Sequence, residues 1–294
     1  MRPPKILVAT DLSASSALAL GEASARTGEG GHLLVCHVVA SWRRVNELFP
    51  QFNEPTPEAD EALAQRARQA VAAFAGRATG RAGEAYEVAI EEGDAAAGIV
   101  RRAEAWGADL VVIGSHGSTS LPRIRLGGVA IDVVRHAHCP VLVVRPAADG
   151  GGGVVAGTDF SDSAMPALHA AVDEVRRTGG RAVLVHAVEW PIVVDAQFAG
   201  WAEIDAEAMQ EVERAAKERL EQALASSGVA GECRVVRGEA GRALVREAEA
   251  AHADLIVVGT HGRTALSRMV LGSVAEFVVR TAHCSVLVVR LHRK

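Results

Sequence analysis

Four residues in the second half of the chain have the types and the spacing of a phosphate-binding loop. An apolar run over 255–258 ends in Gly259, and Gly262 and the pair Gly272 and Ser273 follow, which gives the spacing G-x-x-G-x9-G-S. Glycine at the end of a strand lets the backbone adopt positive φ and approach a ligand without a Cβ in the way. A helix predicted over 274–280 would then begin where free N–H groups favour a phosphate and the serine hydroxyl can cap or donate. The same glycines could equally end a strand and begin a helix in a protein that binds no ligand.

A carboxylate follows another predicted strand, near 153–158. Asp159 stands there in the sequence Gly-Thr-Asp-Phe-Ser. In a parallel sheet this strand end lies beside the end of the strand near 254–259, so Asp159 can accept hydrogen bonds from ribose hydroxyls. The alternative is that Asp159 or Ser161 caps the helix predicted over 164–177. The convergence of this acid with the glycines on one cleft favours a ligand site.

The chain is a tandem repeat. Residues 107–145 and 252–290 are identical at 25 of 39 positions, and near the start of each half Asp11 matches Asp159. Repeats of this length indicate duplicated domains. The glycine-rich stretch 146–153 is typical of a linker, so we expect domains over 1–146 and 153–294.

Within each half, short apolar runs alternate with longer amphipathic stretches, as in βαβ units. In the second half we expect strands near 153–158, 181–188, 232–236, 254–259 and 285–290. A charged face on the helix predicted near 203–226 indicates a solvated surface. The predicted fold is α/β, with two tandem Rossmann-like domains, each a five-stranded parallel sheet with helices on both faces. In such sheets the ligand lies beyond the carboxyl ends of the strands.

Composition and charge exclude several classes of protein. The chain has 294 residues, of which 49% are apolar, and a net charge of −5 from 31 basic and 36 acidic residues. With no basic excess, we expect no nucleic-acid partner. The four cysteines form no C-x-x-C pair, which favours free thiols in the cytoplasm. We find no targeting segment or membrane span in the sequence and expect no membrane partner.

The combined pattern resembles the universal stress proteins, and specifically their tandem two-domain form. The resemblance covers nearly the whole chain and is most specific at the G-x-x-G-x9-G-[S/T] pattern, supported by the strand-end acid and by H-A-H-C-P-V-L-V-V-R over 136–145. It implies an adenine nucleotide α-hydrolase-like fold and a stress-response protein that binds an adenine nucleotide, ATP with or without Mg²⁺. It also implies that the two repeats pair as an intrachain pseudo-dimer, and a homodimer of chains stays open.

The resemblance implies roles for the strand-end residues of the second half. Thr158 and Asp159 would lie near the adenosine, and the main chain at Ala187 and Val188 would meet the adenine edge. The phosphate loop and the phosphate contacts would come from Val258, Gly259, His261, Gly262, Arg263, Gly272, Ser273 and Val274.

The first half carries a weaker form of this site. Its residues are Thr10, Asp11, Val38, Gly114, Gly117, Gly127 and Gly128. Gly128 stands where the pattern needs a hydroxyl, and the lost hydrogen bond is worth about 0.5–1.5 kcal/mol, or up to about tenfold in affinity. Pro122 replaces Ser267 and stiffens the loop, and Ser118 replaces Arg263 and removes a cation. We therefore expect the second half to bind ATP more tightly than the first.

The sequence offers little for catalysis. No G-x-x-x-x-G-K-[S/T] loop is present, so no lysine would bridge the terminal phosphates. His116 and His261 match in position and could act as a slow general base, although a loop imidazole more often faces solvent. The His-Cys pairs at 138–139 and 283–284 suggest zinc, but adjacent residues of an extended chain point to opposite faces. We expect no catalytic residue and no metal ligand; the alternative is a slow ATPase or another adenine-nucleotide enzyme using the same cleft.

Two segments rich in aromatic residues and proline follow the second strand of each half, at 40–59 and 189–208. They could pack over the sheet edge, close over the ligand clefts or mediate self-association. The sequence does not decide between these roles.

Overall fold

The chain folds into two compact units, Met1–Pro146 and Ala147–Lys294. The computed structural model describes residues 3–28, 30–39, 57–80, 85–117, 126–146, 152–189, 206–260 and 271–290. Most of the aromatic-rich segments 40–59 and 189–208 lies outside these ranges, so the roles raised for them stay predictions.

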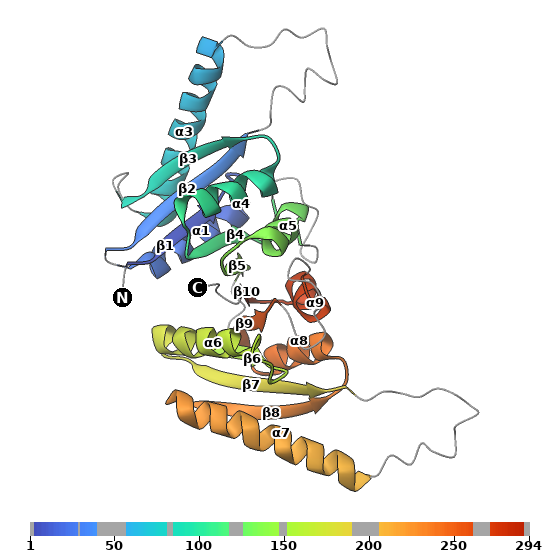
Figure 1. The fold of residues 1–294 in the computed structure, drawn as a ribbon. Helices are drawn as coiled ribbons and strands as arrows, with labels where there is room; N and C mark the ends of the chain where they lie inside the picture. The colour runs from blue at the N-terminus through green and yellow to red at the C-terminus, as the bar shows by residue number, and fades with distance from the viewer. Residues whose placement is uncertain are drawn as a thin grey trace, which may run out of the picture. The chain divides into compact units, whose positions relative to one another are not determined.

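The first unit alternates strands and helices (Figure 1). Its elements are β1 (Lys5–Ala9), α1 (Ala14–Thr27), β2 (His32–Val39), α3 (Pro57–Thr79), β3 (Glu87–Glu92), α4 (Ala95–Trp106), β4 (Leu110–Gly114), α5 (Gly128–His136) and β5 (Val141–Val144).

The second unit repeats this order. Its elements are β6 (Gly153–Gly157), α6 (Met165–Thr178), β7 (Arg181–Val188), α7 (Ala206–Ser227), β8 (Gly231–Arg237), α8 (Ala240–Ala250), β9 (Ala253–Gly259), α9 (Ser273–Thr281) and β10 (Ser285–Val289). The five strands predicted for this half are present within one or two residues of the expected bounds.

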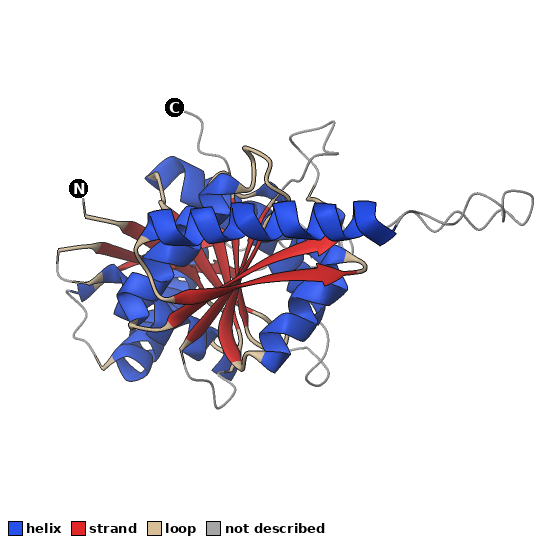
Figure 2. Ribbon diagram, turned by 90° about the horizontal axis from the view of Figure 1, so that it is seen from below, coloured by secondary structure: helices blue, strands red, loops and turns tan. Residues whose placement is uncertain are grey.

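Each unit has a parallel sheet of five strands. The strand order is β3-β2-β1-β4-β5 in the first unit and β8-β7-β6-β9-β10 in the second. Helices cover both faces of the strands, as Figure 2 shows. In the first unit α1 contacts α3, and α4 contacts α5. The predicted Rossmann-like α/β fold is confirmed, and the strand order reverses beside β1 and beside β6.

The strands form the core because both of their faces are covered. Leu7 and Val8 in β1 and Val111 and Val112 in β4 are fully buried. This explains why these strands are continuous apolar runs rather than alternating ones. None of the helices in the described ranges combines the length and the apolarity needed to cross a membrane.

The repeated Ala-Asp-Leu sequence has the same structural role in both units. The carboxylate of Asp109 accepts a hydrogen bond from the backbone N–H of Lys5 at 2.9 Å, and that of Asp254 accepts one from Gly152 at 2.7 Å. Each aspartate therefore ties the beginning of β4 or β9 to the beginning of the neighbouring central strand. This satisfies a donor that the sheet itself leaves unpaired.

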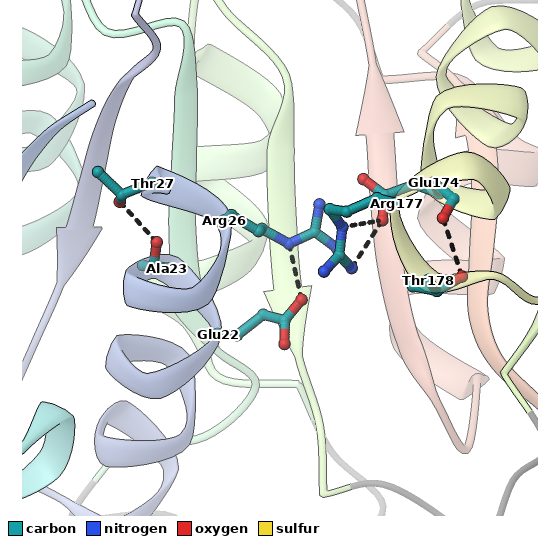
Figure 3. Close-up of polar contacts among 7 residues, drawn as sticks. All are labelled: Glu22, Ala23, Arg26, Thr27, Glu174, Arg177 and Thr178. Atoms are coloured by element: carbon teal, nitrogen blue, oxygen red, sulfur yellow. Dashed lines mark hydrogen bonds and ion pairs between the residues drawn. The ribbon is translucent and has the colours of Figure 1, made fainter. Parts of the chain in front are cut away.

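The helices α1 and α6 end in the same way, as Figure 3 shows. Thr27 donates its hydroxyl hydrogen bond to the carbonyl of Ala23 at 2.7 Å, and Thr178 donates to that of Glu174 at 2.9 Å. An arginine precedes each threonine and pairs with a glutamate of its own helix. Gly28 and Gly179 follow with positive φ of 64° and 71°, which glycine adopts without strain, and Gly179 has the left-handed conformation that commonly ends a helix.

We predict that Asp254→Ala lowers the free energy of unfolding by about 1 kcal/mol, because it leaves the N–H of Gly152 without its partner. Urea denaturation followed by circular dichroism measures this change. Asp173→Ala is the control: that side chain is 75% exposed and its ion pair with Arg176 is 3.6 Å long, so we expect a change within about 0.5 kcal/mol. Equal losses in the two variants would contradict the assigned role.

Candidate functional site

A cavity of about 190 Å³ opens at the carboxyl ends of β1, β2 and β4 in the first unit. All seven residues predicted for the first-half site line it: Thr10, Asp11, Val38, Gly114, Gly117, Gly127 and Gly128. Apolar walls from Cys36, Ile99 and Ile113 complete it. The structure thus brings residues of five separate segments to one cavity.

The loop after β1 holds Asp11 in a fixed turn. The carboxylate of Asp11 accepts the N–H of Ser13 at 3.1 Å, and the hydroxyl of Thr10 accepts the N–H of Leu12 at 3.0 Å. Leu12 has φ of 65°, which is uncommon for a residue other than glycine. These side-chain bonds compensate for that conformation. Ser13, rather than the aspartate, caps α1 by accepting from the N–H of Ser16.

The loop after β6 has the same geometry. The N–H of Phe160 bonds to the Thr158 hydroxyl at 3.0 Å, and the N–H of Ser161 bonds to the Asp159 carboxylate at 3.0 Å. Phe160 has φ of 62°. The alternative that Asp159 or Ser161 caps the following helix is wrong: α6 begins after Ala164 and no side chain caps it.

A histidine in the second strand of each unit supports this loop, and the sequence analysis missed both. His37 donates from Nδ1 to the carbonyl of Thr10 at 2.7 Å, and His186 donates to that of Thr158 at 2.8 Å. Because a carbonyl can only accept, the neutral ring must carry its proton on Nδ1. Their matching positions in the two repeats were the signal that could have found them.

In the second unit this support is extended by a stack of three side chains. The rings of Phe160 and His186 lie 4.5 Å apart, and the guanidinium of Arg219 lies over Phe160 at 4.3 Å from the ring centroid. A cation over an aromatic face is attracted to it. Arg219 belongs to the charged face of α7, for which the sequence indicated a solvated surface, yet its guanidinium reaches the loop that carries Asp159. The first unit has Leu12 in place of the phenylalanine.

The strand-end glycines are required by close packing. Glycine at a strand end allows positive φ, but Gly114, Gly117, Gly127 and Gly128 do not adopt it. A Cβ on Gly114 would lie 2.9 Å from the backbone carbon of Ser15, and one on Gly117 would lie 2.9 Å from the Asp11 carboxylate. The absent side chains therefore let the end of β4 approach α1 and the acid.

The loop between β4 and α5 is closed at its neck. The N–H of Gly127 donates to the carbonyl of Ser115 at 2.9 Å, and in the second unit the N–H of Gly272 donates to that of Thr260 at 2.8 Å. The glycine spacing therefore corresponds to the length of a loop whose two ends are joined by a backbone hydrogen bond. The N–H groups of Gly127 and Gly272 are already used in these backbone hydrogen bonds. A ligand would therefore contact the amides that follow them in α5 and α9.

The helices α5 and α9 begin without a side-chain cap. In the first unit α1 and α4 are capped by Ser13 and Asp94. The first turn of α5 borders the cavity, since Gly128, Val129 and Ala130 line it. The amides of such a first turn can bind an anion.

The structure places the second-half site residues at matching strand ends. Thr158 and Asp159 follow β6, Ala187 and Val188 end β7, Val258 and Gly259 end β9, and Gly272, Ser273 and Val274 begin α9. Because β6 pairs with both β7 and β9 in parallel, these ends lie along one sheet edge. His261, Gly262 and Arg263 lie outside the described residues, so their predicted roles stay predictions.

Two ionisable groups of the first-unit cavity are kept neutral. Burial raises the pKa of the Cys36 thiol to about 12. Burial and the nearby Arg145 lower the pKa of His116, whose Nδ1 lies 2.8 Å from the Ser115 hydroxyl. Its Nε2 is buried and has no hydrogen-bond partner among the described residues. The lowered pKa leaves this half-buried imidazole unprotonated and less basic than a free histidine.

The histidine and cysteine that precede β5 differ in exposure. His138 is exposed whereas Cys139 is fully buried. Cys284 is also fully buried. This is the divergence expected of neighbours in an extended chain.

Comparison with known proteins gives a consistent result. The model of the universal stress protein family matches residues 4–145 and 153–290. A universal stress protein of Mycobacterium tuberculosis is 34% identical over 191 residues, covering 62% of this chain and only 61% of that protein's length. One from Methanocaldococcus jannaschii is 33% identical over 141 residues, covering 48% and 83%. A solved universal stress protein of Archaeoglobus fulgidus shares the fold, with a TM-score of 0.66 at 21% identity over 98% of this chain and 97% of that one.

We predict that His116 makes stability depend on pH. Because folding lowers its pKa, the unfolded chain binds more protons, so the free energy of unfolding falls as the pH drops below about 6.5. His116→Gln should reduce this loss, as measured by urea denaturation at a series of pH values. His136→Gln, at the exposed end of α5, is the control and should leave the pH dependence unchanged. Identical pH profiles for the two variants would contradict the prediction.

Proposed function

The chain belongs to the universal stress protein family, and from that premise we propose that each unit binds an adenine nucleotide, above all ATP, at its strand ends. Nucleotide occupancy would alter conformation or partner choice, so that the protein acts in the stress response by binding rather than by rapid turnover. The observation that carries the proposal is the first-unit cavity, which all seven predicted residues of that half line.

The residues around the cavity fit the parts of a nucleotide. Val38 and Ile99 offer apolar walls for a base, and Asp11 offers a carboxylate for the ribose hydroxyls. The uncapped first turn of α5 offers amides for the phosphates. Among the described lining residues Asp11 has the only carboxylate, so a Mg²⁺ ion would be held chiefly by the phosphates themselves.

The alternative is a slow ATPase or another adenine-nucleotide enzyme that uses the same cleft. The cavity provides a thiol whose raised pKa makes it a poor nucleophile, which favours binding over covalent chemistry there. The pairing of the two repeats, a homodimer of chains and a cytoplasmic location belong to the same proposal and rest on the family.

We predict that protein purified without added nucleotide carries adenine nucleotide, released on denaturation and measured by chromatography. Gly272→Glu should remove it from the second unit, because a carboxylate at the start of α9 would occupy the place of the phosphates. The backbone there, with φ of −62°, accepts a side chain. Ser273→Ala should weaken retention. Absence of nucleotide, with no uptake of added ATP, would contradict the proposal; accumulation of ADP and phosphate would favour the enzyme.

Adding a hydroxyl at the start of α5 and removing the one at the start of α9 should change the affinity for ATP in opposite directions. A Cβ on Gly128 would meet nothing within 4 Å, so Gly128→Ser adds a hydroxyl without a clash. We predict that it tightens ATP binding by the first unit up to about tenfold, and that Ser273→Gly weakens the second by a similar factor. Calorimetric titration measures both. Gly128→Ala is the control, and an equal effect of alanine and serine would contradict a role for the hydroxyl.

A further inference from the structure

The turn that carries Asp11, which we call the aspartate turn, is tied to β2 by two hydrogen bonds of the residue before it. The N–H of Thr10 donates to the carbonyl of Cys36 at 2.9 Å, and the carbonyl of Thr10 accepts from Nδ1 of His37 at 2.7 Å. Because β1 has ended one residue earlier, the imidazole extends the link between β1 and β2 beyond the strand itself. The chain then changes direction at Leu12, with its φ of 65°.

The second unit has the same pair of hydrogen bonds. The N–H of Thr158 donates to the carbonyl of Val185 at 3.0 Å, and the carbonyl of Thr158 accepts from Nδ1 of His186 at 2.8 Å. The residue after the aspartate also packs on this imidazole, since the rings of Phe160 and His186 lie 4.5 Å apart. Two repeats whose loops differ in sequence thus keep one connection, from an imidazole of the second strand to the carbonyl before the aspartate.

The imidazole of the first unit acts from outside the cavity. Cys36 and Val38, the neighbours of His37 in β2, both line the cavity. Successive residues of a strand point to opposite faces, so His37 projects from the other face of the sheet. It therefore acts on a ligand through the turn that it holds, in which Asp11 lines the cavity.

We propose that His37 is a positioning residue for the recognition of ribose; the inference rests on the proposed function, in which the Asp11 carboxylate binds the ribose hydroxyls. The imidazole fixes the carbonyl of Thr10 and with it the planar peptide group that leads to Asp11. The carboxylate must lie within hydrogen-bond distance of the hydroxyls, and a small rotation of the aspartate turn moves it out of range. His186 has the same role for Asp159.

A purely structural role would have different consequences. If the imidazole only stabilised the sheet, its loss would weaken the binding of ATP and of a nucleotide without ribose hydroxyls by the same factor. If it positions Asp11, its loss weakens ATP selectively, because 2′,3′-dideoxy-ATP has no hydroxyl to donate to the carboxylate. The ratio of these two affinities therefore separates the two roles.

The experiment measures the affinities for ATP and for 2′,3′-dideoxy-ATP by calorimetry, in a Gly272→Glu parent whose second cleft is blocked. We expect the parent to prefer ATP, and His37→Leu to lower this preference about tenfold, mainly by weakening ATP. His37→Asn should restore most of the preference, because its amide nitrogen is bonded to Cγ, as Nδ1 is, and can donate to the same carbonyl. His37→Gln places its amide nitrogen one bond further out and should behave like the leucine variant.

His32→Leu is the matched control, since it makes the same substitution at the exposed beginning of β2, and the preference for ATP should stay unchanged. Circular dichroism identifies the variants that are folded at the temperature of the titration.

A preference for ATP that is unchanged in His37→Leu and His37→Gln would overturn the inference and leave nucleotide binding intact. Equal binding of the two nucleotides by the parent would overturn the inference together with the ribose contact of Asp11. A parent that binds neither nucleotide would overturn the inference together with the proposed function of the first unit.

Discussion

Parallel pairing of the central strands is the constraint on which the site depends. In the first unit Val8 pairs with Val112 of β4, and Ala9 pairs with Cys36 of β2. Because these strands run in one direction, the loops that follow them leave from the same edge of the sheet. The order reverses beside β1, so its loop and the loop after β4 enclose a cavity instead of packing together. Shifting this register would separate Asp11 from the glycines.

The fold and most candidate residues could be predicted because they depend on patterns that a sequence displays. Apolar runs gave the strands, and the glycine spacing is preserved because Gly127 closes the loop on Ser115 through the backbone. The reason for the glycines could not be predicted: Gly114 is required by Ser15, which lies far away in sequence. Nor does a sequence show which carbonyl a strand end leaves unpaired, and so His37 and its counterpart were missed.

The two repeats share the same backbone frame around the strand ends, whereas some of the side chains on this frame differ. Both units retain the aspartate turn, the supporting histidine and the closed loop neck, which are held by backbone atoms and by residues of the same strands. The differences include groups that project from this frame: Leu12 against Phe160 with its arginine, and Gly128 against Ser273. Because these groups do not hold the sheet, they could change without cost to the core.

The ionisation states of the residues that line the first-unit cavity are relevant to whether it binds a ligand or catalyses a reaction. The thiol of Cys36 and the imidazole of His116 are both held neutral, chiefly by burial, and the carboxylate of Asp11 is engaged in its own turn. A nucleophile or base needs a pKa near the working pH. The described part of this cavity offers apolar walls and the uncapped first turn of α5. Under the proposed function these groups would hold a nucleotide through its base and its phosphates.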